Sequence, residues 1–379
     1  MGDRIESVEV RIMSVPLPRP VAWANVKVEA REYVLVWIHS ADGITGLGYT
    51  VGSRFDGGAK TIRSVITDGL LPLLIGKDPS EIERLWEDMS FHALLLGGRT
   101  GGAATRAISA VDIALWDLLG KRAGLPLCDL LGRYRSRVPA YASGGYYYHD
   151  DLQKDCDTLI EEVERHVELG FEAVKIKIGR IRADQDLVRV TKVLETVGPG
   201  IKVAVDANHA WRDSSSAIRE LLPFDDLGLW WIEEPVLPDQ MEASAAIAQR
   251  LRTPIATGEI EAGRSAFMRL MDMKAAGILQ PDATVVGGIS EWLKVAHTAA
   301  SKGIGVAPHW VPEIHVHLGA CTPGVLALEY FHSGVGVLNF QELLATTLVV
   351  EEGEVVVPSN PGHGIDLDGE AVERFEVHV

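Results

Sequence analysis

The segment AVKIKI at residues 173–178 is a short apolar run that carries two lysines, and the chain holds eight apolar runs of similar length. Each has the length of a buried strand, and most end in a polar or charged residue. The runs cover residues 138–143, 173–178, 202–206, 230–233, 255–259, 278–282, 305–309 and 325–329. Amphipathic stretches lie between them, such as residues 158–170, where Gly170 is placed to end a helix. Eight strands that alternate with helices at this spacing predict a (β/α) barrel.

The residues before and after the runs predict two further parts. Strand character at 5–15 and 34–39, a hairpin-type turn at 41–43, and helical stretches at 80–89 and 105–121 indicate an α+β unit. A doubly wound sheet is the alternative to the barrel, but no Gly-rich phosphate loop follows the first run. The expected organisation is an α+β domain over 1–135, a barrel over 136–340, and a segment over 341–379 that returns to the first domain.

Composition restricts the class of partner. The 379 residues carry 53 acidic and 36 basic side chains, a formal net charge of −17, which argues against a nucleic-acid partner. Local cations must therefore attract any anionic substrate. The three cysteines form no CxxC pair, the first residues lack a signal-peptide core, and no apolar stretch is long enough to span a bilayer. These features predict a cytoplasmic enzyme that contacts no membrane.

Charged residues gather where the predicted strands end. Lys175 and Lys177 lie two apart on one strand, so both side chains point to the same face. About one βα unit separates each of the following strand-end residues: Asp206, Glu233, Glu259, Asp282, His309 and Glu329. A single strand-end acid is usually a helix cap, and a single histidine is usually a packed residue. Recurrence over successive strands instead predicts one site at the C-terminal mouth of the barrel, where barrel enzymes keep their active sites.

Three of these residues have the chemistry of a metal site. Asp206, Glu233 and Glu259 offer only hard oxygen ligands, which favour Mg²⁺, or Mn²⁺, over Zn²⁺. His315 and His317 form an H-x-H pair that suggests zinc, but no third soft ligand stands near them in the sequence.

Several motifs together resemble the enolase superfamily, and specifically its mandelate racemase subgroup. They are AVDIALWDLLGK (110–121), VKIKIG (174–179), VDAN (205–208), WIEEP (231–235), TGE (257–259), QPD (280–282), PH (308–309) and LE (328–329). The matches span nearly the whole chain, and their combination is specific although each piece is weak. The resemblance implies an α+β capping domain over a modified (β/α)₇β barrel of the TIM type, and commonly a homo-oligomer, from dimer to octamer.

Residues that match the family's motifs are expected to have the roles that the family gives to those positions. The resemblance implies that Asp206, Glu233 and Glu259 bind Mg²⁺, with Glu234 orienting them. It makes Lys177 the base on one face of the substrate carbon. Lys175 beside it binds the substrate carboxylate and keeps Lys177 partly neutral near pH 7.

The opposite face belongs to a second group of residues. His309 resembles the acid/base there, with Asp282 fixing its tautomer. Glu329 resembles the group that hydrogen-bonds the enediolate formed when the α-proton leaves. Asn208 is the expected contact of the 2-hydroxyl, and Ser143 is a further candidate contact.

The fate of that enediolate depends on residues outside the barrel. Two opposed bases serve both racemisation and dehydration, so specificity is expected from cap loops at residues 17–30 and 49–58. These carry a polar mixture suited to a polyhydroxylated chain: Arg19, Trp23, Asn25, Lys27, Arg54 and Asp56. Arg19 and Trp23 are the named candidates for substrate binding. The favoured hypothesis is Mg²⁺-dependent dehydration of an acid sugar, an aldonate or aldarate, to a 2-keto-3-deoxy acid.

Other functions remain open. Within the family they are racemisation or epimerisation of a 2-hydroxy acid, and cycloisomerisation of a sugar lactone. Outside it, a Schiff-base aldolase also uses a strand-end lysine but needs no triad of carboxylates. A non-catalytic binding protein would be expected to have lost part of the cluster.

Overall fold

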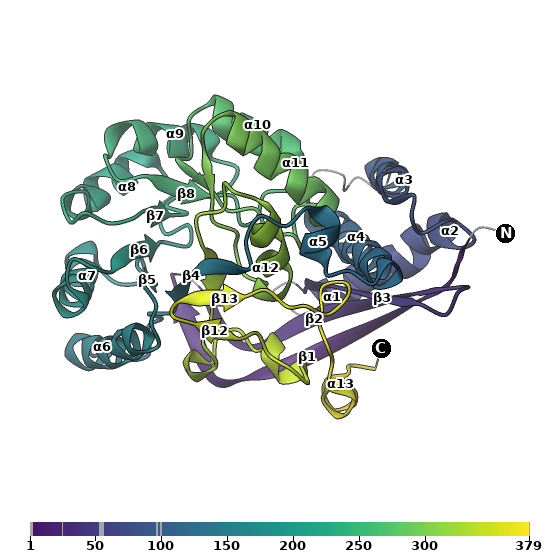
Figure 1. Cartoon of the computed structure of the whole chain (residues 1–379). Helices are drawn as coiled ribbons and strands as arrows, with labels where there is room; N and C mark the ends of the chain where they lie inside the picture. Colours follow the sequence, from purple (N-terminus) through teal and green to yellow (C-terminus); the bar gives the residue numbers. More distant parts are fainter. Residues whose placement is uncertain (1–2, 25, 53–56, 96–97, 99–100, 379) are drawn as a thin grey trace.

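The computed structural model describes residues 3–24, 26–52, 57–95, 98 and 101–378. The N-terminal part is an antiparallel sheet in the order β1-β2-β3, with helices packed on one side (Figure 1). Its strands are β1 (Ile5–Trp23), β2 (Val26–Ser40) and β3 (Thr45–Val51). Its helices are α1 (Gly58–Ser64), η1 (Val65–Leu70), α2 (Leu71–Leu74), α3 (Ile82–Leu95), α4 (Gly102–Ala123) and α5 (Leu127–Leu131).

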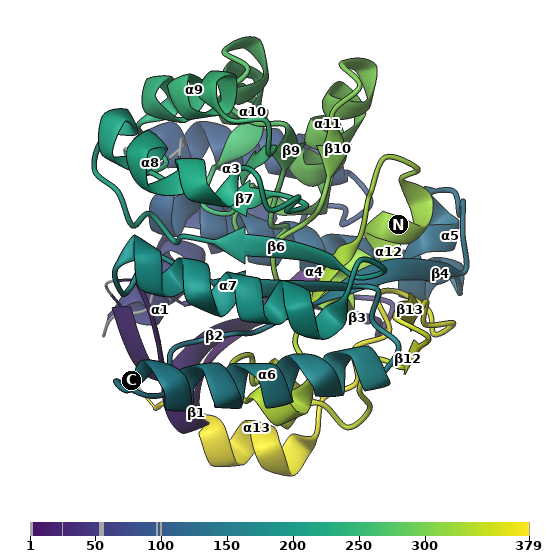
Figure 2. The same cartoon turned by 90° about the vertical axis from the view of Figure 1, so that its left-hand side faces the viewer.

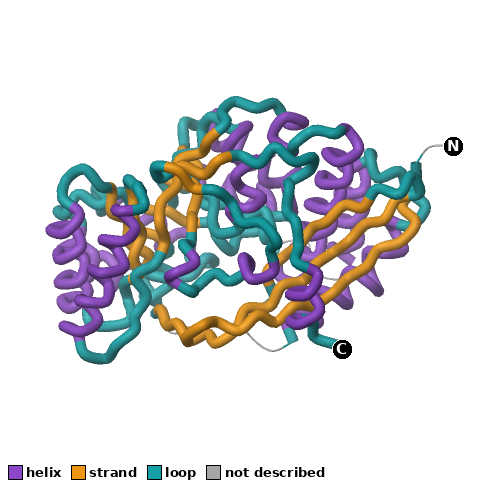
Figure 3. Tube along the Cα trace, turned by 60° about the horizontal axis from the view of Figure 1, so that its bottom comes forward, coloured by secondary structure: helices purple, strands orange, loops and turns teal. Residues whose placement is uncertain are grey.

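The first two strands are longer than the sequence predicted. Residues 17–30, expected as a loop, lie mostly in β1 and β2, so they form the far end of one long hairpin (Figure 3). The register shifts between the pairs Pro16–Ala30 and Val21–Val28. Pro16, Pro18 and Pro20 fall in this stretch, and a proline has no N–H to donate to a ladder. The irregular pairing explains why the stretch reads as a loop.

Helix α4 packs closely against β3 because two glycines leave room for it. A Cβ at Gly46 would meet the carbonyl oxygen of Ala114 at 2.1 Å, and one at Gly48 would meet that of Ala110 at 2.0 Å. Any larger residue at either position would push the helix away from the sheet. The small side chains therefore fix how the sheet sits on α4, and α4 in turn packs against the barrel.

The barrel is a closed ring of parallel strands. Neighbours follow the order β10-β9-β8-β7-β6-β5-β4, β11 pairs with β4, and a bridge between Val306 and Val325 closes the ring. The strands are β4 (Arg137–Ser143), β5 (Ala173–Lys177), β6 (Lys202–Asp206), β7 (Ile232–Glu233), β8 (Ile255–Thr257), β9 (Ile278–Leu279), β10 (Gly305–Val306) and β11 (Leu328–Tyr330). Several are shorter than the sequence predicted, because Glu259, Asp282 and His309 already lie in the loops that follow β8, β9 and β10.

Helices cover the outside of this ring, and Figure 2 shows α6 and α7 lying side by side there. They are α6 (Leu152–Glu168), α7 (Ala183–Val197), α8 (Ser214–Leu221), η2 (Leu222–Phe224), α9 (Met241–Arg250), α10 (Gly263–Asp272), α11 (Gly288–Ser301) and α12 (Pro312–Cys321). In the part of the chain that the structure describes, no helix combines the length and apolar character needed to cross a membrane.

The C-terminal segment contacts both other parts. It contains η3 (Ser333–Val335), η4 (Phe340–Leu343), β12 (Val350–Glu351), β13 (Glu354–Val356) and α13 (Gly369–Phe375). Strand β13 pairs antiparallel with the start of β4, on the barrel. Beyond α13, the Val377 N–H donates to the Ile12 carbonyl of β1.

The cap and the barrel meet at the loop after β9. The buried Asp112 of α4 accepts hydrogen bonds from the backbone N–H and hydroxyl of Ser290, at 3.0 and 2.6 Å. Thr50 of β3 donates to the Thr284 carbonyl at 2.7 Å, and Trp86 of α3 donates to the Gly287 carbonyl at 2.6 Å. The cap therefore fixes the loop that begins with Asp282.

Candidate active site

The inside of the barrel explains why the site residues converge. One layer of interior side chains consists of Tyr141, Ala173, Ala204, Trp231, Ala256, Ile278, Ala307 and Ala327. Since side chains alternate along a strand, residues two positions later face the same interior at its upper edge. These are Ser143, Lys175, Asp206, Glu233, Gly258, Gln280, His309 and Glu329. Most of the residues predicted from strand ends thus form one ring at the barrel mouth.

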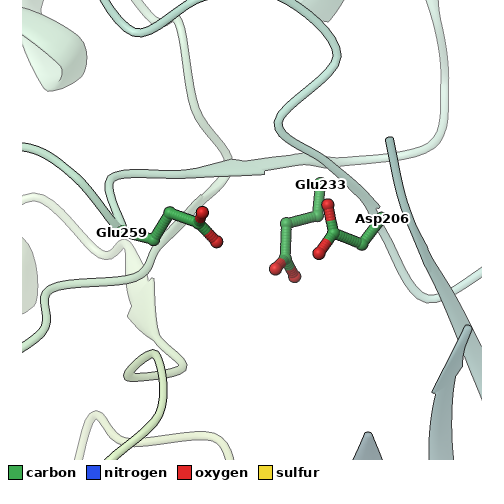
Figure 4. A group of neighbouring side chains, drawn as sticks. All are labelled: Asp206, Glu233 and Glu259. Carbon is green, nitrogen blue, oxygen red and sulfur yellow. The ribbon is translucent and has the colours of Figure 1, made fainter. Parts of the chain in front are cut away.

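Three carboxylates of this region form a group that can hold a metal. Asp206 and Glu233 end β6 and β7, and Glu259 follows β8 (Figure 4). One oxygen from each lies within 4.8 Å of the others, and all three residues are buried. Burial and the neighbouring carboxylates Asp206, Glu329 and Glu259 raise the pKa of Glu233 to about 8, although Lys175 opposes the shift. Buried, mutually repelling oxygen ligands fit a hard divalent cation such as Mg²⁺.

Neighbouring side chains hold two of the glutamates in place. Glu233 accepts hydrogen bonds from Trp231 Nε1 at 2.9 Å and Gln280 Nε2 at 2.7 Å. Glu234, in the left-handed region with φ 41°, accepts from the Thr257 hydroxyl and the Gly258 N–H, both at 2.8 Å. Outer partners of this kind orient metal ligands. Glu234 was expected in this role, whereas Trp231 and Gln280 lie in the WIEEP and QPD motifs but had no role predicted for them.

The two lysines lie among these carboxylates rather than apart from them. Lys175 Nζ is 2.5 Å from Glu233 Oε1 and 2.8 Å from Glu329 Oε1. Lys177 Nζ forms a hydrogen-bonded ion pair with Asp206 Oδ2. Burial disfavours its charged form, yet the Asp206 carboxylate raises the pKa of Lys177 above its ordinary value. Asp206 thus opposes the effect expected from Lys175, and partial neutrality of Lys177 near pH 7 stays a prediction that depends on what else Asp206 binds.

His309 and Asp282 form the predicted pair. His309 Nδ1 donates to Asp282 Oδ2 at 3.0 Å, and His309 Nε2 is 3.4 Å from Glu259 Oε2. Asp282 Oδ1 accepts from the backbone N–H and the hydroxyl of Thr284, both at 2.7 Å. Burial opposes the charged imidazole, but Glu259 and Asp282 raise the pKa of His309. Lys177 ends β5 and His309 follows β10, so β6, β7 and β8, the strands that carry the triad, lie between them in the strand order.

Glu329 lies between Lys175 and the backbone of Trp310. Its Oε1 faces Lys175, and its Oε2 accepts the Trp310 N–H at 2.9 Å. Burial opposes ionisation, but Lys175 and His309 lower the pKa of Glu329 to about 2. An ionised carboxylate has no proton to donate, so Glu329 acts on an enediolate in this arrangement only through Lys175 or after taking up a proton.

Several buried polar atoms at the mouth have no hydrogen-bond partner within the described residues. They are Tyr141 Oη, Ser143 Oγ, Asn208 Oδ1 and Gln280 Oε1. Buried polar atoms are almost always paired, so unpaired atoms gathered at one place indicate a site that a ligand completes. The candidate contacts Ser143 and Asn208 are both in this set.

The structure separates the candidates from the cap. Trp23 is buried, and its ring centroid lies 5.6 Å from that of Tyr146, which lies under Lys177. Arg19 is instead exposed, with its guanidinium 3.7 Å from the Tyr148 ring, and it lines a different cavity with Arg165 and His332.

Of the four other cap candidates, the structure describes Lys27 alone. Lys27 is exposed and pairs with Glu29 at 3.4 Å. Asn25, Arg54 and Asp56 lie outside the described residues.

His315 and His317 are buried and have separate structural partners, so the zinc alternative finds no support. His315 Nε2 accepts the Ala283 N–H at 3.1 Å, and its Nδ1 donates to the Trp310 carbonyl at 2.8 Å. His317 Nε2 donates to the His363 carbonyl at 2.9 Å. Burial lowers the pKa of each imidazole to about 4.

His315 also links the two halves of the His309–Asp282 pair. Ala283 directly follows Asp282 in the chain, and Trp310 directly follows His309. Trp310 and Val311 both lie in the left-handed region, at φ 55° and 34°. Such a backbone persists only where its surroundings hold it, and His315 is one of the groups that do so.

Comparison with known proteins gives a consistent result. Residues 7–132 match the mandelate racemase / muconate lactonizing enzyme N-terminal domain, and residues 158–372 match the enolase C-terminal domain-like family. The L-talarate/galactarate dehydratase of Salmonella typhimurium is 35% identical over 98% of this chain and 90% of its own length. A 3,6-anhydro-alpha-L-galactonate cycloisomerase of Streptomyces coelicolor is also 35% identical, over 98% of this chain and 99% of its own.

A solved structure agrees closely in its fold. The L-talarate dehydratase of Polaromonas sp. JS666, in complex with Mg and L-glucarate, has a TM-score of 0.88 and 35% identity, covering 100% of this chain and 98% of its own. Together with the site geometry, these matches show that the chain belongs to the enolase superfamily, in its mandelate racemase subgroup.

Proposed function

We propose that this chain is a Mg²⁺-dependent acid-sugar dehydratase, which removes the α-proton of a carboxylate and then water, leaving a 2-keto-3-deoxy acid. The observation that carries removal of the α-proton is that Lys177 and His309 come from strands on either side of those that hold the carboxylate triad in the strand order. Because two such groups also serve racemisation, the choice of dehydration rests on the relatives. Among the relatives are dehydratases of talarate and galactarate and of arabinonate, which supports an acid sugar as the substrate.

The metal would be held by Asp206, Glu233 and Glu259. When bound, Mg²⁺ would neutralise the charge that develops on the substrate carboxylate as the α-proton leaves. Asp206 Oδ2 faces Lys177, so ligation by this oxygen would weaken the ion pair that keeps Lys177 charged. Lys175 would then disfavour the protonated form of Lys177, as a neighbouring like charge does.

The chain's own residues supply both proton transfers. Neutral Lys177 takes the α-proton, and the C–H electron pair passes into the enediolate, which Lys175 stabilises at a carboxylate oxygen. His309 then gives a proton to the 3-hydroxyl as its C–O bond breaks and water leaves. The enol that remains takes up a proton at C3 and becomes the 2-keto-3-deoxy acid. Asp282 fixes the ring by accepting from Nδ1, so that Nε2 faces the reacting atoms. General acid–base catalysis of this kind contributes about 10²- to 10⁴-fold per group.

An acid-sugar panel tests the proposal. Purified protein with Mg²⁺ is expected to convert at least one aldonate or aldarate into a 2-keto acid, detected with semicarbazide, and EDTA is expected to abolish the reaction. The dehydratase proposal fails if no acid sugar gives a keto acid while mandelate-like acids exchange their α-proton in D₂O. Racemisation would then take its place.

The aldolase alternative has a separate test. A Schiff-base aldolase needs no triad of carboxylates, whereas Asp206, Glu233 and Glu259 form one beside Lys177. We expect borohydride with a keto acid to leave Lys177 unmodified, and covalent trapping would establish the aldolase.

We further propose that the protein works in the cytoplasm as a homo-oligomer. The three cysteines, Cys128, Cys156 and Cys321, are all free thiols, which supports a reducing compartment. Light scattering of the purified protein decides the oligomeric state.

A further inference from the structure

A cavity of about 260 Å³ adjoins the reaction centre and reaches into the cap. One side is formed by Glu259, Asp282 and His309, and the cap side includes Arg31 and Arg106. It therefore joins the metal triad and the His309 pair to two arginines from another domain. The sequence analysis named neither arginine, because nothing in the order of residues places β2 or α4 beside β10.

Arg31 is held on the roof of the site by two aromatic rings. Its guanidinium carbon lies 5.3 Å from the Trp23 ring and 4.5 Å from the Trp310 ring, and its Nε donates to the Val337 carbonyl. The Trp310 ring lies against His309, with 5.1 Å between the centroids. On the other side, Trp23 contacts Tyr146.

These contacts form a continuous belt, which we define as Lys177, Tyr146, Trp23, Arg31, Trp310 and His309. The belt runs from one proton-transfer group to the other across the cap side of the reaction centre. Arg31 stands in its middle, and only 3% of its surface is exposed. A fixed, buried cation at that place suits an anionic group of a substrate already anchored at the triad.

Arg106 brings a second positive charge to the same cavity. It is half-buried on α4, and its side chain donates to the Val51 carbonyl at 3.1 Å. Arginine is the residue that matches the planar, two-oxygen geometry of a carboxylate.

We propose that Arg31 and Arg106 bind the second carboxylate of a dicarboxylic acid sugar, so that the substrate class is the aldarates. This inference rests on the proposed function, because the first carboxylate is taken to lie at the triad. An aldonate would place an uncharged hydroxymethyl group in the cavity, where it cannot pair with two cations. Local cations at both ends of the substrate would also overcome the repulsion expected from a net charge of −17.

Matched pairs of substrates that differ only at the terminal carbon test the inference. Galactarate with galactonate, and glucarate with gluconate, are compared by kcat/KM for keto-acid formation in the presence of Mg²⁺. The wild type is expected to prefer the aldarate. Arg106→Gln is expected to lower kcat/KM for the aldarate about ten- to a hundredfold, mostly through KM, and to leave that for the aldonate nearly unchanged.

Two further variants complete the experiment. Arg31→Lys keeps the positive charge but loses the planar guanidinium with its paired N–H groups. This variant is expected to lower the ratio of kcat/KM for the aldarate to kcat/KM for the aldonate. Arg84→Gln removes an exposed arginine that pairs with Glu81, and should leave the ratio unchanged. If Arg31→Lys does not fold, the substrate preference of Arg106→Gln alone tests the inference.

The results separate the two proposals. Turnover of aldonates at least as good as that of their aldarates, or an unchanged ratio in Arg106→Gln, overturns the diacid inference and leaves the dehydratase intact. Failure of all acid sugars to give a keto acid or exchange the α-proton overturns both.

Discussion

The barrel mouth and the long β1–β2 hairpin contribute to the same site in different ways. At the mouth, each reactive group lies on or just beyond its own strand, and most stand two positions after a residue of the interior layer. Along the hairpin, Trp23 and Arg31 reach the site only because two domains pack together. The chemistry is therefore encoded locally, whereas recognition of the rest of the substrate depends on tertiary contacts.

The largest expected effect lies at the mouth. Glu259→Gln removes a charged ligand from the triad and should weaken Mg²⁺ binding by about a hundredfold or more, with loss of activity. Calorimetric titration with Mg²⁺ alone measures the first effect. Glu261→Gln is the matched control, since Glu261 is near in sequence but outside the triad. Equal weakening in both variants would show that general acidity, and not the triad, binds the metal.

An intermediate effect is expected where α12 supports the mouth from within the barrel. His315→Gln should lower kcat about ten- to a hundredfold, because His309 and Asp282 lose the side chain that connects their loops. Its pH–rate profile should shift along the limb that reports His309. His317→Gln should reduce stability and leave that profile in place. A shift common to both variants would assign His315 a merely structural role.

The smallest effect concerns the joint between cap and barrel. Burial raises the pKa of Asp112 from 3.8 to about 7, against the opposing hydrogen bonds from Ser290. The folded state thus holds a proton that the unfolded state has released between these pH values, so stability falls as the pH rises through this range. Asp112→Asn should reduce this loss in Tm between pH 5 and pH 8.

The partner residue gives the opposite expectation. Ser290→Ala removes the hydrogen bonds of its hydroxyl to Asp112 and Trp116, and should steepen the fall in Tm with pH. An identical pH dependence in wild type and Asp112→Asn would exclude Asp112 as its source.

The sequence predicted the barrel and its ring of charged residues because both recur at a regular spacing along the chain, about one βα unit. Their spacing alone predicts that Asp206, Glu233, Glu259 and the His309–Asp282 pair lie together, as they do in the structure. It considered Lys175 beside Lys177 but not Asp206, because that carboxylate lies 29 residues away in the chain.

The cap was less predictable. Residues 17–30 were expected as a loop, because prolines are unusual within a strand. Strand β1 nevertheless continues through this proline-rich stretch. Arg19 carried the right charge but lies over Tyr148 beside another cavity, while Arg31 twelve positions on faces the reaction centre. Which of two arginines on a hairpin enters the site depends on strand register and domain packing, and neither leaves a periodic signal.

Exchange of the α-proton in D₂O tests the central claim, two opposed proton-transfer groups over one metal site, most directly. With Mg²⁺ and an acid-sugar substrate, the account predicts that His309→Asn loses keto-acid formation but still incorporates deuterium at the α-carbon through Lys177. Lys177→Met is predicted to lose both, while Lys202→Met, at the other end of the barrel, loses neither. Dehydration at the wild-type rate by either Lys177→Met or His309→Asn would contradict the account.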